Sequence, residues 1–261
     1  QDATNLYRTL AKHNPAAYNP DLAESLNNLA GSQAKNGQQH EALKTAQEAV
    51  SISRNLAKHD PAAYNPKLAI SLDNLALRLD EDGQRDKALE TAQEATDRYY
   101  DLAREDREVY DPNYATSLNN LAKYLAENGQ RDEALTTARK AVSIRRRLAD
   151  QNPAIYAPSL AMSLNNLAIY LSQVGQRSEA LTTIWESISL YRRLADQSPA
   201  TYIPELAKSL SNLALRLDED GQHDEALKTV QEAVEIYHGL VRSEPHTFSR
   251  DFIRCLNTRA S

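Results

Sequence analysis

The sequence predicts an all-α fold, a right-handed superhelical solenoid of antiparallel helix pairs. Five glycines lie 46 residues apart, at Gly37, Gly83, Gly129, Gly175 and Gly221. Five tyrosines keep the same spacing, at Tyr18, Tyr64, Tyr110, Tyr156 and Tyr202. A fixed period between about 20 and 50 residues is typical of stacked repeats, in which each repeat covers the apolar face of its neighbour. No segment alternates with a period of two, so we expect no β-strands.

The first helix of each repeat is predicted from its ends and its apolar face. In the first full repeat, Asn19 and Pro20 have the residue types preferred at the N-cap and at the first helical position. The helix is therefore expected over about 20–36, with Leu26 on its buried face. Gly37 follows it and supplies the left-handed residue that commonly ends a helix.

The second helix is expected over about 39–58. Ala42 and Ala46 lie on one face of it, and small side chains there let two helices approach closely. The segment 59–66 is predicted to be a short linker stiffened by its two prolines. We expect Tyr64, within this linker, to fill the seam between successive repeats.

These helices divide the chain into one continuous array. The five full repeats are predicted at 15–60, 61–106, 107–152, 153–198 and 199–244. Residues 1–14 align with the end of a preceding second helix, and 245–261 with a partial repeat or capping helix. Since the array opens inside a repeat, we expect further repeats or another domain before it in the parent protein.

Charge and composition exclude several kinds of partner. The net charge is −6, whereas nucleic acids and anionic membranes require a basic surface. No apolar run approaches the roughly 20 residues that span a bilayer. The one cysteine, Cys255, cannot form an internal disulfide, which favours a reducing compartment and hence a cytoplasmic location.

The sequence shows no catalytic or metal-binding pattern. The six histidines lack zinc-type spacing, and no phosphate-binding loop or nucleophile elbow occurs. The glycines are placed to end helices. We therefore expect no enzyme activity, no catalytic residue, no metal and no cofactor.

The block SLNNLA-x6-GQ-x2-EAL-x2-A-x2-AV at 25–50 resembles a tetratricopeptide repeat, closest to the long-repeat type of kinesin light chains. The usual family positions correspond to Leu26, Leu29, Ala30, Gly37, Ala42, Ala46 and Ala49. The repeat is longer than the usual ~34 residues. The segment YNPDLAESLNNLA is also similar in sequence to repeat arrays that adjoin NB-ARC-type signalling ATPases. The resemblance implies that the first helices line a concave groove that binds a peptide or protein.

Five asparagines, here called the asparagine row, occupy one position of the predicted groove: Asn28, Asn74, Asn120, Asn166 and Asn212. An asparagine amide offers one donor and one acceptor, as does a peptide unit. Helices about 8–10 Å apart would contact roughly every third residue of an extended peptide. The resemblance to kinesin light chains implies the same backbone contacts. Recent duplication, or a hydrogen bond between helices, would also explain the row.

The residues beside this row are expected to complete the binding surface. They are Leu77, Lys123, Ile169 and Leu215. Ile70 and Met162 lie one helical turn before Asn74 and Asn166 of the row. A solvated face should be polar, so apolar side chains here predict a semi-apolar groove. The alternative is that some of them pack against the first helix of the next repeat.

The sequence thus predicts a non-catalytic scaffold for protein–protein interactions. Two alternatives stay open: a structural or oligomerisation array, and a sensor module of a larger NB-ARC-type signalling ATPase. We expect a monomer for this chain, with end-to-end association through an exposed terminal seam as a further option.

Overall fold

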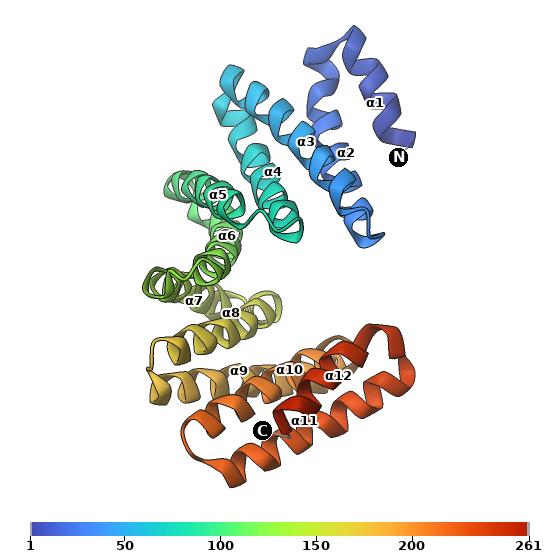
Figure 1. Cartoon of the computed structure of the whole chain (residues 1–261). Helices are drawn as coiled ribbons and strands as arrows, with labels where there is room; N and C mark the ends of the chain where they lie inside the picture. The colour runs from blue at the N-terminus through green and yellow to red at the C-terminus, as the bar shows by residue number, and fades with distance from the viewer. Residues whose placement is uncertain (1, 260–261) are drawn as a thin grey trace. The chain divides into compact units, whose positions relative to one another are not determined.

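The computed structural model describes residues 2–259, which form α-helices joined by short connections. The chain divides into two compact units, residues 1–130 and 131–261. Within both units, consecutive helices pack as antiparallel pairs (Figure 1), which confirms the predicted all-α repeat fold.

In unit 1 the helices are α1 (Asp2–His13), α2 (Pro15–Lys35), α3 (Gln39–His59), α4 (Pro61–Glu81), α5 (Arg85–Glu105) and α6 (Arg107–Glu127). Each packs against the next along the chain, and α2 also contacts α4. The even-numbered helices of this unit are therefore the first helices of their repeats and lie side by side.

In unit 2 the helices are α7 (Arg131–Gln151), α8 (Pro153–Gln173), α9 (Arg177–Gln197), α10 (Pro199–Glu219), α11 (His223–Ser243) and α12 (Pro245–Arg259). Here α10 contacts both α8 and α12. None of the helices in residues 2–259 combines the length and the apolar character needed to cross a membrane.

Small residues fill the seam between the two helices of a repeat. In the first full repeat Ala42, Ala46 and Ala49 of α3 have no exposed surface, and Ala30 of α2 is 1% exposed. Leu26 of α2 is fully buried and belongs to the same core cluster as Ala49. Because a methyl side chain is small, the alanines let the two helix backbones approach closely. The leucines fill the remaining space between them.

The predicted helix ends at the glycines are confirmed. Gly37 has a φ of +77°, in the left-handed region, and the other four glycines of the series lie between +79° and +81°. The Gly37 amide donates to the Ala34 carbonyl at 3.0 Å and the Gln38 amide to the Gln33 carbonyl at 2.9 Å. These two bonds are the Schellman pattern, which satisfies the last carbonyls of α2.

The predicted start of the first helix is wrong. Helix α2 begins at Pro15, with Asn14 as its N-cap accepting from the Ala17 amide, and Asn19 and Pro20 lie inside the helix. The N-cap and proline signature occurs twice in this segment, five residues apart, and the earlier copy starts the helix. Pro20 removes one helical bond in a turn where Ala16 is exposed, so water can replace it.

The predicted linker at 59–66 is correspondingly wrong, because a single residue, Asp60, separates α3 from α4. The tyrosines of this segment belong to the first helices. Tyr18 of α2, for example, packs with Tyr7 of α1 and Ile52 of α3 around a buried core that includes Leu22. A tyrosine at this position therefore joins three helices from inside a helix rather than from a loop.

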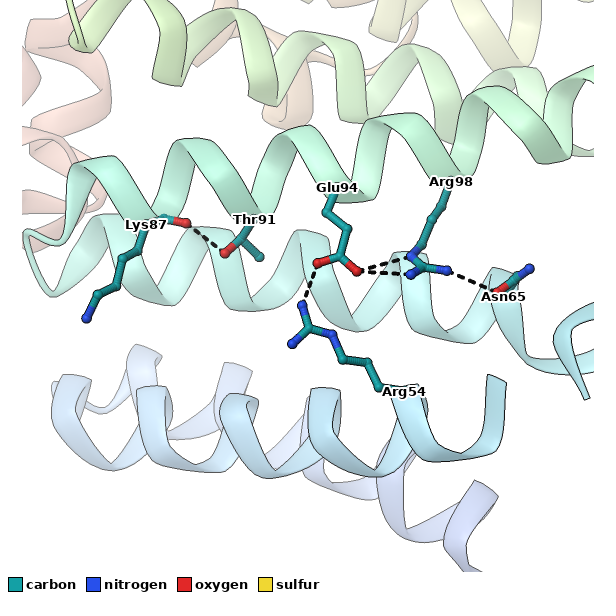
Figure 2. A network of polar contacts seen from close by, with 6 residues as sticks. All are labelled: Arg54, Asn65, Lys87, Thr91, Glu94 and Arg98. Carbon is teal, nitrogen blue, oxygen red and sulfur yellow. Dashed lines mark hydrogen bonds and ion pairs between the residues drawn. The ribbon is translucent and has the colours of Figure 1, made fainter. Parts of the chain in front are cut away.

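Ion pairs connect neighbouring second helices. Arg54 of α3 contacts Glu94 of α5 at 2.5 Å, and Glu94 also accepts from Arg98, which donates to Asn65 of α4 (Figure 2). The same pairing recurs at Arg8–Glu48, Arg146–Glu186 and Arg192–Glu232. Exposed pairs of this kind contribute at most about 1 kcal/mol each, so packing carries most of the stability.

We predict opposite effects for two glycine-to-alanine substitutions. Gly83→Ala places a Cβ on a left-handed residue and should lower the free energy of unfolding by about 1–2 kcal/mol. Gly239→Ala, inside α11 with open space around the added Cβ, should raise it by up to about 1 kcal/mol. Urea denaturation of both variants measures this, and equal effects would contradict the assigned helix end.

Candidate functional site

Four members of the asparagine row have amides that are free to meet a partner. Asn28 is exposed on α2, and Asn74 of α4 and Asn120 of α6 are half-buried in the same unit. Asn166 of α8, in unit 2, is also half-buried. Within residues 2–259, the side-chain amides of these four make no hydrogen bond.

Asn212 of α10 differs from the others. It is only 4% exposed, and its Nδ2 donates to Oδ1 of Asn165 in α8 at 3.0 Å. A hydrogen bond between helices was one of the two alternative explanations for the row, and it applies at this position. The structure therefore leaves Asn212 without a free amide.

The residues beside the row form a partly apolar surface. Leu77 and Ile70 of α4 are 38% and 45% exposed, and Met162 of α8 is 41% exposed. Ile169 of α8 and Leu215 of α10 are half-buried, and so contribute less open surface.

Lys123 of α6 is engaged by its own unit. Its Nζ lies 2.6 Å from Asp80 of α4 and 3.8 Å from Glu127, and it sits 5.1 Å from the ring centre of Tyr124. Its charge is thus already balanced by two carboxylates. A partner contacting Lys123 would meet a neutralised group rather than a free cation.

A pocket of about 320 Å³ opens between α2, α3 and α4. Among the residues around it are Asn27, Asn28, Ser53, Ile70, Ser71 and Asn74. The pocket therefore brings together two members of the asparagine row and one of the exposed apolar residues. The sequence had predicted these three residues for a binding surface, without predicting a pocket.

One side of the pocket is polar. Ser71 Oγ donates to the Lys67 carbonyl at 3.0 Å and accepts from Asn27 Nδ2 at 2.9 Å. Since the Ser71 proton is used, the Ser53 hydroxyl must donate to Ser71 across 3.0 Å. Oδ1 of Asn27 is buried and has no hydrogen-bond partner among the described residues. A buried acceptor of this kind costs free energy until a donor reaches it.

Ser53 and Asn27 were not predicted as site residues. The signal was available in the position that Ser53 occupies in the repeat. The residues at that position elsewhere are Tyr7, Tyr99, Arg145, Tyr191 and Tyr237. Ser53 is therefore a small residue at a position that holds a tyrosine in four of its five equivalents.

The next repeat carries a carboxylate where the first carries Asn27. Asp73 of α4 accepts from Ser117 Oγ of α6 at 3.0 Å. Burial raises the pKa of Asp73 from 3.8 to about 7, although the Ser117 hydrogen bond opposes this. The carboxylate is thus held at a position where the charged form is disfavoured.

Among the described residues, no three histidine, cysteine, aspartate or glutamate side chains are arranged to hold a metal ion. Cys255 is buried in α12 and accepts from Ser211 Oγ at 3.3 Å, and burial raises the pKa of its thiol. Its environment is that of a packed residue.

A family model described as tetratricopeptide repeat matches residues 22–62, 115–153, 160–199 and 206–241. A search of curated proteins finds no match.

Solved structures show the same fold. BtubC (BKLC) from P. vanneervenii superposes with a TM-score of 0.73 at 22% identity, covering 92% of this chain and 88% of that one. A Podosopora anserina putative kinesin light chain with nearly identical TPR-like repeats gives 0.66 at 21% identity, covering 85% and 98%. YrrB, described as a TPR protein with an unusual peptide-binding site, gives 0.53 at 15% identity, covering 99% and 100%.

We predict that Asp73→Asn stabilises the protein in a pH-dependent way. The pKa of Asp73 is higher in the folded than in the unfolded chain, so its carboxyl favours folding below about pH 4 and disfavours it as pH rises through about 7. The substitution should therefore raise the free energy of unfolding at pH 8, by up to about 4 kcal/mol, and change it little at pH 4.

Urea denaturation at both pH values measures this effect. Asp101→Asn, which makes the same chemical change at an exposed position on α5, is the matched control. A gain for Asp73→Asn that is the same at pH 4 and pH 8 would contradict the raised pKa.

Proposed function

We propose, since this chain belongs to the tetratricopeptide repeat family, that it is a protein-interaction scaffold binding an extended peptide segment across its first helices. Proteins of this family generally mediate protein–protein contacts, and the fold is typically non-catalytic. The observation that carries the proposal is in unit 1: the free amides of Asn28 and Asn74 lie at one pocket on neighbouring first helices.

The two asparagines suit a peptide backbone. Each amide can donate to a carbonyl and accept from an N–H of the same peptide. Packed helices are about 8–10 Å apart, and an extended chain rises about 3.3 Å per residue. Asn28 and Asn74 would then contact peptide units about three residues apart, and Asn120 on α6 would continue the series.

Apolar contacts would supply part of the affinity. Ile70 and Leu77 lie exposed on α4, close in sequence to Asn74. Covering an exposed aliphatic side chain contributes roughly 25 cal/mol for each Å² removed from water. The surface therefore suits a segment that alternates backbone contacts to the asparagines with apolar side chains. The similarity to YrrB, whose description includes a peptide-binding site, supports this class of ligand.

The proposal predicts that removing the amides weakens peptide binding. Peptides are first selected on the protein from a random peptide display library, and their dissociation constants are then measured by fluorescence anisotropy. The variant Asn28→Ala/Asn74→Ala should bind them at least about tenfold more weakly, because two hydrogen-bonding groups worth about 1 kcal/mol each are lost.

Asn55→Ala is the matched control, since it makes the same chemical change at an exposed position of the second helix α3. It should bind the peptides as tightly as the unsubstituted protein. Equal affinity for the double variant and the control, or the absence of any selected peptide, would overturn the proposal.

A further inference from the structure

The pocket at Ser53 has a counterpart in unit 2 that serves as an internal comparison. Four repeats further along the chain, the equivalent positions of Asn27, Asn28, Ser53 and Ser71 are held by Ser211, Asn212, Tyr237 and Cys255. These four residues also surround a pocket, but its volume is only about 10 Å³, against about 320 Å³ at Ser53. The main increase in side-chain size is the tyrosine ring at Tyr237.

A tyrosine at this position is normally part of the core. Tyr99, Tyr191 and Tyr237 are each only 3% exposed. Tyr99 packs with Ala69 and Tyr110. The equivalents of those two neighbours in the preceding repeat are Ala23 and Tyr64, and both border the open pocket. The pocket is therefore the space that a tyrosine ring fills elsewhere in the array.

The polar side of the pocket fits the hydroxyl group of such a ring. Asn27 Oδ1 is a buried acceptor without a partner in the described structure, and a phenol is a hydrogen-bond donor. In the next repeat, burial and then the negative charge of Asp73, the residue equivalent to Asn27, raise the pKa of Tyr99.

We propose that the Ser53 pocket binds a tyrosine side chain presented by the partner peptide. This inference rests on the proposed function, because a peptide held by Asn28 and Asn74 passes the opening of the pocket. The ring would contact Ala23, Tyr64 and Ile70, and its hydroxyl would donate to Asn27. Phenylalanine would leave that acceptor unsatisfied, so the site favours a phenol over an unsubstituted ring.

The first test uses p-cresol, which is the tyrosine side chain without its backbone, so that pocket and peptide are examined separately. Proton–nitrogen correlation NMR follows its titration into the protein. We expect saturable shifts of the Asn27 side-chain amide and of the Ser53 and Ser71 backbone amides. The equivalent signals of Ser211 and Tyr237 should not move, and toluene should bind at least about tenfold more weakly.

The second test closes the pocket with the residue that the array itself uses. Ser53→Tyr should abolish p-cresol binding, and circular dichroism checks that the variant stays helical. Ser53→Ala, which keeps the space and removes one hydroxyl, should retain binding within about threefold. If Ser53→Tyr does not fold, the p-cresol titration of the unsubstituted protein still tests the proposal, because the Ser53 amide signal should shift and the Tyr237 signal should not.

The outcomes separate the pocket from the proposed function. No saturable shift with p-cresol, shifts that are equal at Ser53 and Tyr237, or equal binding of toluene would overturn the pocket proposal. Binding of p-cresol combined with no peptide binding would leave the phenol pocket standing and overturn the peptide-binding function. If the selected peptides bind Ser53→Tyr as tightly as the unsubstituted protein, the peptide does not use this pocket. That result would overturn the proposal that the pocket holds a tyrosine of the peptide.

Discussion

Close packing between successive helices is the constraint on which the rest of this structure depends. Alanines such as Ala42 and Ala46, with no exposed surface, bring the two helices of a repeat together, and the left-handed Gly37 turns the chain between them. Each pair then covers its neighbour, so no repeat is stable by itself. Because this helix packing repeats every 46 residues, a residue changed at one position can be compared directly with its equivalents in the other repeats.

A small residue at a position that normally holds a large one therefore has a definite consequence. The helices around Ser53 are held apart by their other contacts, so the missing tyrosine ring leaves an opening instead of a collapsed seam. The serine also keeps a polar partner for Ser71, which in turn holds Asn27 in place. The candidate site thus arises from a local departure from the repeat within an otherwise regular frame.

The sequence predicted the period, the helix pairs and the glycine-terminated ends, because these follow from spacing and from backbone chemistry that act locally. It misplaced the start of the first helix, since two N-cap and proline signatures compete within one segment, at Asn14 and at Asn19. It also predicted Asn28, Ile70 and Asn74 as surface residues. The pocket that joins them was not predicted, because its cause, Ser53, lies on the other helix of the pair. The burial of Asn212 depends on a contact with Asn165, which spacing alone does not distinguish.

The central claim is that the space beside Ser53 matches a tyrosine side chain. The most direct measurement is the free energy of unfolding of Ser53→Tyr from urea denaturation. Burying an aromatic ring in a matching space should raise it by about 1–3 kcal/mol, even though the Ser53 hydrogen bond is lost. A decrease of similar size would show that the ring has to displace its surroundings. The repeats would then not share one packing arrangement at this position.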